Sequence, residues 1–312
     1  MTLTSDRGAS RGAITLARNG HSVALTCHMG ALSGRFRRNS MPAISECLDA
    51  GASRIEIDIH SLDGDDYIVY HDRHLEADTD GRGSIGRVTP DDVRRVHFIS
   101  DPLDRPPLLS EVIARASGTS TEVQLDLKDW RLLPDERIRV LSSVVAPMKE
   151  RVIVSSGQDW NLRKLHRFDS ELRIGFDPGH YLDYAVEGSD VILPHRLGAY
   201  GYRDDHPLAF GRTEATADYL RERLSTLVLM VPAAREFFFN FRMVLQMLDD
   251  GFNPAAWLHE RGIALTVWTP DYSGAESCSW LERLIDAGVD RITTNTAPAW
   301  VEAFAARNGS SA

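Results

Sequence analysis

The chain has 312 residues and a formal net charge of −10 at pH 7, with a calculated pI near 5.6. This length allows one large α/β domain or two smaller ones, and either arrangement can bury a substantial core. The acidic balance argues against general nucleic-acid binding and against docking on an anionic membrane surface, although local arginine clusters could still attract one phosphate.

The N-terminal region and the cysteines indicate the compartment. Residues 1–20 are polar and lack the apolar core, about 7–15 residues long, of a signal peptide. No segment reaches the ~20 consecutive apolar residues of a membrane-spanning helix. Cys27, Cys47 and Cys278 have no metal-ligand spacing and cannot all pair, and we interpret Cys27 and Cys47 as small buried residues. We therefore expect a reduced, cytoplasmic protein without a transmembrane anchor.

Short β-like segments alternate with helical patterns along most of the chain. Strands are predicted near residues 22–27, 53–59, 67–71, 121–127, 151–156, 171–176, 189–194, 262–269 and 290–294. Helices are predicted at 41–50, 90–96, 109–116, 134–148, 160–168, 253–261 and 276–287. The strand at 67–71 follows its neighbour across a tight turn, which leaves eight strands in the alternation. This pattern predicts an α/β fold, a single-domain (β/α)8 TIM barrel, with a doubly wound open sheet as the alternative.

Residues 199–252 fit the alternation poorly, and we predict an insertion there, after the sixth strand and on the active-site side. The segment ends in a Phe-rich stretch that we interpret as an amphipathic helix, with an apolar face made of Phe237, Phe238, Phe241, Val244, Leu245 and Leu248. So large an apolar face must be buried against the barrel, a lipid chain or a second subunit. A homo-oligomer formed through 199–252 is thus one alternative, and the insertion is expected to shape substrate choice.

Two carboxylates stand together on the predicted strand at 53–59. Glu56 and Asp58 occupy positions i and i+2, so they point to one face, whereas Ile55, Ile57 and Ile59 point to the other. Paired carboxylates repel each other unless a cation lies between them, and oxygen ligands suit a hard ion such as Mg²⁺ or Ca²⁺. The alternative is a solvated strand end without a metal.

Other strands also end in charged or imidazole groups. His28 follows the strand at 22–27, and His71 with Asp72 follows the one at 67–71. Asp126 and Lys128 share a face of the strand at 121–127, where a carboxylate between Leu125 and Leu127 needs a partner if it is buried. Because the C-terminal ends of barrel strands surround one site, these groups are expected to meet. The remaining candidates lack this context and are interpreted as structural or surface histidines: His60, His74, His166 and His180.

These residues, in this order, carry a family resemblance. The matching motifs are His28-Met29-Gly30, Glu56 with Asp58, His71-Asp72, Trp268-Thr269 and the closing stretch Gly288-Val289-Asp290 with Thr293-Thr294-Asn295. The chain resembles the glycerophosphodiester phosphodiesterase family and its relative sphingomyelinase D, a phospholipase D-like branch. Asp126-Leu127-Lys128 is similar to the sphingomyelinase D pattern, whereas the stretch from Asp72 to Val88 looks like the phosphodiesterases.

The resemblance implies a site and a chemistry. It implies one divalent cation, with Mg²⁺ expected and Ca²⁺ as the alternative, held by Glu56, Asp58 and Asp126. His28 and His71 would act as general acid and base, with Asp72 orienting His71 or capping a turn. Further substrate contacts are expected from Lys128, Trp268 and Asp271, with a core position as the alternative for Trp268 and a loop carboxylate as the alternative for Asp271. Lys128 would hold a phosphate oxygen or merely pair with Asp126.

The chain also departs from the family pattern. Met29 stands where the motif has an arginine, and Arg37-Arg38 replace a proline-glutamate pair. One of Arg35, Arg37 and Arg38 is therefore expected to replace the missing phosphate-binding cation, with a solvated loop as the alternative.

Three functions follow from the resemblance. The leading prediction is metal-dependent hydrolysis of a small glycerophosphodiester. The first alternative is a phospholipase D-type reaction on sphingomyelin or a lysophospholipid, which releases the head group and leaves a cyclic phosphate. The second alternative is a non-catalytic barrel that binds a phosphorylated ligand.

Overall fold

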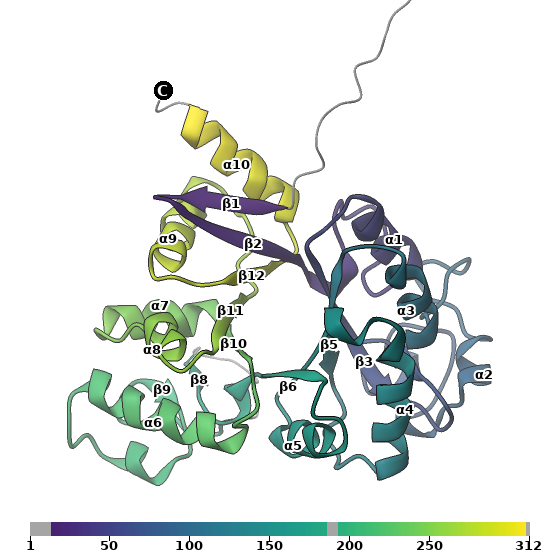
Figure 1. The fold of residues 1–312 in the computed structure, drawn as a ribbon, viewed down its shortest axis with the longest axis horizontal. Helices are drawn as coiled ribbons and strands as arrows, with labels where there is room; N and C mark the ends of the chain where they lie inside the picture. Colours follow the sequence, from purple (N-terminus) through teal and green to yellow (C-terminus); the bar gives the residue numbers. More distant parts are fainter. Residues whose placement is uncertain (1–13, 186–192, 310–312) are drawn as a thin grey trace, which may run out of the picture.

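The computed structural model describes residues 14–185 and 193–309, and within them eight parallel strands close into a barrel. The barrel strands are β2 (His21–Cys27), β3 (Arg54–Ser61), β5 (Glu122–Leu127), β6 (Val152–Ser156), β7 (Arg173–Phe176), β10 (Glu236–Asn240), β11 (Ala264–Trp268) and β12 (Arg291–Thr294). β2 pairs in parallel with both β12 and β3, which closes the sheet. The predicted (β/α)8 barrel is confirmed, and the open sheet is excluded (Figure 1).

Helices cover the outside of the barrel. They are α1 (Met41–Asp49), α2 (Pro90–Val93), α3 (Leu109–Ser117), α4 (Asp135–Val145), α5 (Asp159–Phe168), α6 (Thr216–Met230), α7 (Phe241–Asp249), α8 (Pro254–His259), α9 (Ala275–Asp286) and α10 (Ala297–Gly309). Short 3₁₀ turns lie at His28–Gly30, Leu75–Ala77, Ile85–Arg87, Ala146–Arg151, Pro178–His180 and Pro207–Phe210. None of the helices in the described ranges combines the length and apolar character that crossing a bilayer requires.

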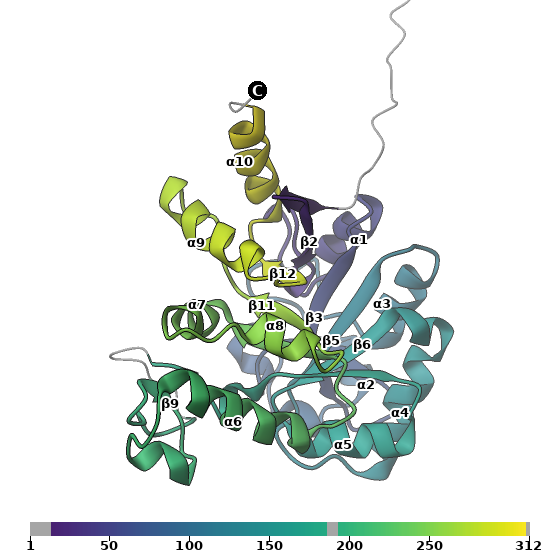
Figure 2. The same ribbon diagram turned by 60° about the vertical axis from the view of Figure 1, so that its left-hand side comes forward.

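Within the part of the chain that the structure describes, four short strands lie outside the parallel ring. β1 (Thr15–Arg18) and β4 (Tyr67–Val69) pair antiparallel with β2 and β3, while β8 (Asp183–Tyr184) and β9 (Tyr202–Arg203) form a separate ribbon. α10 lies beside β1, so the first and last described elements meet (Figure 1). The segment with β9 and α6 lies at the opposite end of the molecule from α10 in both views (Figure 2).

The alternation in β3 determines which side chains enter the barrel. Ile55, Ile57 and Ile59 are fully buried and belong to the main apolar core, together with residues of α1 and α3. Because successive side chains of a strand point to opposite faces, Glu56 and Asp58 face the barrel interior. The isoleucines that pack against the helices occupy the outer face of β3, so both carboxylates lie on its inner face.

The prediction of a helix at the Phe-rich stretch is wrong at its beginning. The Phe-rich stretch was predicted to begin an amphipathic helix, but residues 236–240 form β10, the sixth barrel strand. Phe237, Phe238 and Phe239 are all buried, as in a parallel strand covered on both faces, where the sequence is apolar without alternation. α7 begins only after Asn240, whose side chain accepts a hydrogen bond from the Arg242 N–H at 3.0 Å. The sixth strand expected at 189–194 falls mainly outside the described residues.

The apolar face expected on the 199–252 segment is covered by the protein itself. Phe237, Phe238 and Val244 are buried. Phe241, Leu245 and Leu248 are partly buried and pack against the main core. Packing within the subunit therefore accounts for this face, and a homo-oligomer stays a prediction that this segment does not require.

Charged side chains of alternating sign fill the N-terminal end of the barrel. Arg54, Glu122, Arg173, Glu236 and Arg291 are each the first residue of a barrel strand. The Arg54 guanidinium, 2 % exposed, donates to Glu122 at 2.6 Å and to Glu236 at 2.6 and 3.0 Å. Burial by itself would lower the pKa of Arg54, but Glu236 and Glu122 hold it above its ordinary value. This end of a barrel serves stability, not chemistry.

Removing this guanidinium should destabilise the fold strongly. We expect Arg54→Met to lower the free energy of unfolding by roughly 3–5 kcal/mol, because the buried Glu236 loses its counter-ion, while Glu122 keeps Arg173 and Arg291. Urea denaturation measures the change. Arg115→Met is the matched control, since it breaks a solvent-exposed pair with Asp49 and should cost less than about 1 kcal/mol. Equal stability losses in the two variants would contradict a structural role for the cluster.

Candidate active site

Two connected cavities lie at the C-terminal ends of the barrel strands. The inner cavity has a volume of about 280 Å³ and the outer one about 440 Å³. Both are lined by His71, Asp126, Lys128, Asp177 and Trp268. The inner cavity is also lined by His28, Glu56, Gln124, Ser155, Phe238, Thr269 and Thr293. The structure thus brings most of the residues predicted for the site to one place.

Three carboxylates from two neighbouring strands meet there. Ligand atoms of Glu56, Asp58 and Asp126 all lie within 4.8 Å of one another. The register places Asp58 of β3 directly beside Asp126 of β5. Glu56 and Asp58 are 3 % and 1 % exposed, so their repulsion is poorly screened by water. Burial, then Asp58 and Asp126, raise the pKa of Glu56 well above its ordinary value.

Neighbouring groups hold two of the carboxylate oxygens by hydrogen bonds. Asn39 donates to Asp58 Oδ2 at 2.7 Å, and the Met29 N–H donates to Glu56 Oε2 at 2.8 Å. The buried Asp58 Oδ1 forms no hydrogen bond with the described residues, but the Lys128 ammonium lies 3.0 Å away from it. Three clustered carboxylates, two of them buried, carry more negative charge than this ammonium can balance. The excess negative charge and the all-oxygen donor set fit a hard divalent ion.

Lys128 lies beside the same carboxylates. Its Nζ is 3.0 Å from Asp58 Oδ1 and 2.5 Å from Asp126 Oδ2. Burial would lower the pKa of Lys128, but Asp126, Asp58 and Glu56 raise it well above its ordinary value, so the ammonium stays charged. Burial likewise opposes ionisation of Asp58, but Lys128 and His71 lower its pKa. Lys128 therefore lies among the carboxylates and also lines both cavities.

A chain of hydrogen bonds fixes the orientation and tautomer of His28. Asp271 accepts from the Asn295 side-chain amide at 2.8 Å, so the oxygen of this amide faces His28 and lies 2.9 Å from Nδ1. Since an amide oxygen only accepts, Nδ1 must carry the proton and the neutral ring leaves Nε2 free. Nε2 points toward Glu56, 3.7 Å from Oε2. Burial lowers the pKa of His28, which favours the neutral ring.

His71 lies in a more open environment. Its side chain is 53 % exposed, and its Nδ1 is 3.4 Å from Asp72 Oδ1, where a proton can be shared. His60, which we interpreted as structural, is buried and contacts the His71 carbonyl oxygen at 3.1 Å. His60 also lines the outer cavity, so it lies closer to the site than its sequence context suggested.

The three arginines after His28 have different surroundings. Arg35 is exposed and reaches Glu46 at 3.8 Å. Arg37 pairs with Asp78 and lies over the Phe98 ring, 3.9 Å from its centroid. Arg38 has no ion pair with another described residue, and it lies close enough to His28 to lower the pKa of that imidazole, after burial and Lys128. Arg37 and Arg38 line a small pocket together with His71.

Trp268 and Asp271 take different positions. Trp268 lines both cavities, and its indole N–H has no hydrogen-bond partner among the described residues. The Asp271 carboxylate accepts from the Asn295 backbone at 2.7 Å and from Thr294 at 3.0 Å. Asp271 thus acts on the site through Asn295 and lines neither cavity.

Sequence reasoning missed Asn39, Asn295 and Asp177 as site residues. Asp177 directly follows β7, so the rule that selected His28 and Asp72 at strand ends could have found it. It lines both cavities, and burial raises its pKa to about 7. The outer cavity continues along the segment between β7 and α6, with Gly179, His180, Asp183 and Leu193. Of residues 199–252, only Phe238 lines either of these cavities.

The pKa of Asp177 predicts a pH-dependent stability. A carboxyl whose pKa is raised on folding stabilises the fold below its unfolded value, near 4, and this contribution is lost as pH rises through about 7. In the presence of a chelator, we expect Asp177→Asn to be more stable than the parent at pH 8 by about 1–3 kcal/mol, with the difference vanishing near pH 4. Urea denaturation across this range tests the prediction. Asp101→Asn, in an exposed loop, is the control, and a pH-independent difference for Asp177→Asn would contradict the prediction.

Comparisons with known proteins agree with this geometry. The sequence profile of the glycerophosphoryl diester phosphodiesterase family matches residues 28–177. A glycerophosphodiester phosphodiesterase of Caldanaerobacter subterraneus is 24 % identical over 267 residues, which cover 82 % of this chain and 88 % of that protein.

Solved structures share the fold. An Oleispira antarctica phosphodiesterase in complex with the product sn-glycerol-3-phosphate has a TM-score of 0.61 and 17 % identity, covering 90 % of this chain and 95 % of the other. A glycerophosphodiester phosphodiesterase from Parabacteroides distasonis has a TM-score of 0.62 and 17 % identity, covering 91 % and 97 %. These likenesses extend over nearly the whole of each chain.

Proposed function

Because the chain belongs to the glycerophosphoryl diester phosphodiesterase family and is a phosphoric diester hydrolase, we propose that it cleaves glycerophosphodiesters to glycerol 3-phosphate and an alcohol in a metal-dependent reaction. The observation that carries the proposal is the inner cavity, where two histidines, three clustered carboxylates and one lysine converge. A phosphodiester needs its charge neutralised, a base for the attacking hydroxyl and an acid for the leaving oxygen. This set of side chains can supply all three.

The proposed metal site consists of Glu56, Asp58 and Asp126. The clustered carboxylate oxygens, whose charge one lysine does not balance, support it, with Mg²⁺ as the expected ion and Ca²⁺ as the alternative. When bound, the ion would neutralise a phosphate oxygen and make phosphorus more electrophilic. Met29 and Asn39 would keep the carboxylates oriented through the hydrogen bonds that they already donate to Glu56 and Asp58.

In the proposed reaction the two histidines move the protons. The attacking hydroxyl, from the substrate itself or from water, gives its proton to the free Nε2 of His28 while its oxygen bonds to phosphorus. The bond from phosphorus to the alcohol oxygen breaks, and His71 gives that oxygen a proton. Attack by a substrate hydroxyl would give a cyclic phosphate, and hydrolysis of that cycle completes the reaction. Asp271 and Asn295 act as positioning residues, since they hold the tautomer of His28.

Lys128 and Arg38 are proposed to bind the non-bridging phosphate oxygens, and Trp268 to form a wall of the pocket. Among the three candidate replacements for the motif arginine, Arg38 is favoured because Arg35 and Arg37 already pair with Glu46 and Asp78. A guanidinium can meet two phosphate oxygens at once, which the thioether of Met29 cannot do.

The clamp by Arg38 has a kinetic consequence. We expect Arg38→Ala to lower kcat/KM by roughly 10- to 100-fold, the effect of losing a charge-assisted hydrogen bond. Steady-state kinetics on the best glycerophosphodiester measures it. Arg35→Ala, in the same loop, is the matched control and should change kcat/KM by less than about twofold. If Arg38→Ala behaves like the control, Lys128 and the metal neutralise the phosphate without it.

A second candidate is the phospholipase D-type reaction on a lysophospholipid or sphingomyelin. It is favoured by Asp126 as the third carboxylate and by the contact of Asn295 with His28, since both residues lie in motifs that resemble sphingomyelinase D. This reaction would release choline or ethanolamine and leave a cyclic lipid phosphate.

One assay separates the candidates. The protein is incubated with a panel of glycerophosphodiesters, lysophospholipids and sphingomyelin, with and without Mg²⁺, and the phosphate esters are identified. Glycerol 3-phosphate with a free alcohol supports the proposed function. A free head group with a cyclic phosphate supports the second candidate. Ligand binding without turnover would support a non-catalytic barrel that binds a phosphorylated ligand.

A further inference from the structure

A third and larger pocket adjoins the active site. Its volume is about 820 Å³, and it lies between residues 73–96 and 129–131. His60 and Arg73 line both this pocket and the outer catalytic cavity, which in turn shares His71, Asp126 and Lys128 with the inner one. The three spaces therefore adjoin one another, and the third is the neighbour of the catalytic cavities on the side of His60 and Arg73.

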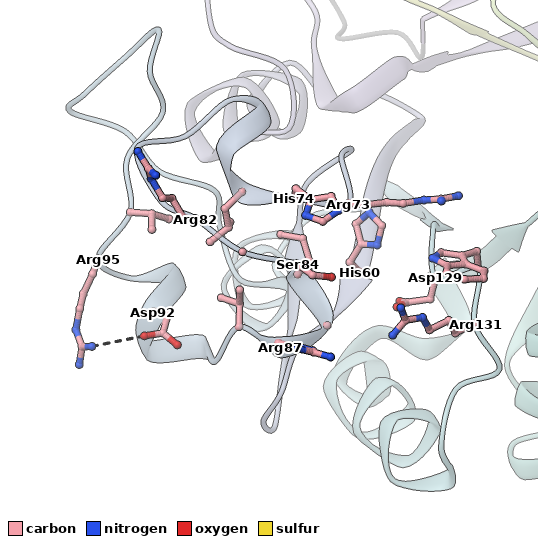
Figure 3. A pocket seen from close by; sticks show the side chains of 17 residues that line it. His60, Arg73, His74, Arg82, Ser84, Arg87, Asp92, Arg95, Asp129 and Arg131 are labelled. Carbon is pink, nitrogen blue, oxygen red and sulfur yellow. Dashed lines mark ion pairs between the residues drawn. The ribbon is translucent and has the colours of Figure 1, made fainter. Parts of the chain in front are cut away.

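The pocket is strongly basic in an otherwise acidic protein. Five arginines and two aspartates line it: Arg73, Arg82, Arg87, Arg95, Arg131, Asp92 and Asp129. Figure 3 shows Arg87 and Arg131 on the same side of the pocket as His60 and Arg73, whereas Arg82 and Arg95 lie at the other end. The lining thus concentrates positive charge where the chain as a whole carries −10.

One of the two aspartates forms an ion pair with an arginine of the pocket, and the other does not. Asp129 accepts hydrogen bonds from the Ser61 N–H at 2.7 Å and from its hydroxyl at 2.9 Å. Asp92 caps α2 through Thr89 and lies 3.7 Å from Arg95. The remaining four arginines have no ion pair with a carboxylate among the described residues: Arg73, Arg82, Arg87 and Arg131. Unpaired guanidiniums that line one pocket repel one another, and a bound anion would relieve this repulsion.

The same region offers a flat apolar surface. The side chain of Trp130 lines the pocket and is 48 % exposed. Arg73 and Arg131 lie over its ring, 5.3 and 5.1 Å from the centroid. An aromatic ring can pack against the carbon face of a polyol ring, while the flanking guanidiniums can bind phosphate oxygens in pairs.

We propose that this pocket binds the alcohol part of the substrate and selects alcohols that carry a further phosphate, such as a phosphorylated cyclic polyol. The inference rests on the proposed phosphodiesterase function and specifies its substrate class. The scissile phosphate occupies the inner cavity, and the distal phosphate is held by Arg87 and Arg131, with Arg73 between the two spaces.

A matched pair of substrates tests this assignment. Glycerophosphoinositol and glycerophosphoinositol 4-phosphate differ only in the distal phosphate. We expect the parent enzyme to have a kcat/KM at least about tenfold higher for the phosphorylated diester, an advantage that shrinks as salt is added. In Arg87→Gln/Arg131→Gln this preference should be lost, while kcat/KM for glycerophosphoinositol changes by less than about twofold. Arg94→Gln, an exposed arginine of the same segment outside the pocket, is the control and should keep the preference.

A binding measurement keeps this inference separate from the proposed function. Calorimetry with inositol 1,4-bisphosphate, which is not a diester, should detect binding to the parent and at least tenfold weaker binding to the double variant. If neither diester is hydrolysed but this difference in binding persists, the proposed function fails and the anion site stands. Hydrolysis of both diesters with equal kcat/KM, unchanged in the double variant, would overturn the inference and leave the function intact.

A parallel experiment tests whether the phosphorylated polyol belongs to a soluble diester or to a lipid head group. Co-sedimentation with phosphatidylcholine vesicles that contain phosphatidylinositol 4-phosphate probes a lipid surface. Binding to these vesicles that the double variant loses, without a preference between the two soluble diesters, would overturn the assignment to a soluble substrate.

Discussion

Alanine at either His28 or His71 is expected to lower kcat by roughly 10²–10⁴-fold, the range for loss of a general acid or base, with the fold unchanged. The physical reason differs between the two sites. His28 presents an unprotonated Nε2 to the inner cavity because Asn295 holds its Nδ1 proton. His71 is exposed beside Asp72 and lines both cavities. Steady-state kinetics on a glycerophosphodiester measures both effects, and circular dichroism checks the fold.

Two further variants make this test specific. His166→Ala, on the outer helix α5, is the control and should keep kcat within about twofold of the parent. Asn295→Ala should lower kcat while leaving KM nearly unchanged, since the ring of His28 loses the acceptor that fixes its tautomer. Near-normal turnover of His71→Ala would refute the assignment of the acid, and near-normal turnover of His28→Ala that of the base.

Removal of the divalent ion should lower the activity about as strongly as the loss of either histidine. We expect treatment with a chelator to lower the rate by at least about 10²-fold, and Mg²⁺ to restore it in the parent but not in Asp58→Asn. The asparagine keeps the shape of the side chain but removes the charge of one of the three clustered carboxylates. Glu150→Gln, an exposed carboxylate just before the N-terminal end of β6 and thus at the other end of the barrel, is the matched control and should recover fully with Mg²⁺.

Thermal unfolding provides a readout that does not depend on turnover. An ion that binds only the folded state raises Tm with its concentration. We expect this rise in the parent and in Glu150→Gln, and a much smaller one in Asp58→Asn. A rise of equal size in all three proteins would place the ion elsewhere, and no response of rate or Tm to chelator and Mg²⁺ would exclude a metal-dependent reaction.

Local pattern was sufficient for much of the fold because each signal depends on a short stretch of chain. The alternation in β3 predicted both the buried isoleucines and the inward pair Glu56 and Asp58. Strand-helix alternation predicted the barrel, and the C-terminal ends of its strands then predicted that His28 and His71 would meet these carboxylates. Local pattern failed at β10, because a strand buried on both faces has no alternation and its Phe-rich run was mistaken for part of a helix.

The sequence by itself therefore determined the barrel, the carboxylate pair and the two histidines, since strand periodicity and strand ends are local properties. Only the tertiary structure decided how their charges and protons are arranged. The contact between His28 and Asn295 joins residues 267 positions apart, and the ion pair of Lys128 with Asp58 joins the ends of two neighbouring strands. The protonation of the carboxylates, the tautomer of His28 and the presence of unpaired arginines depend on burial and on distances between strands. These distances are fixed only when the barrel closes.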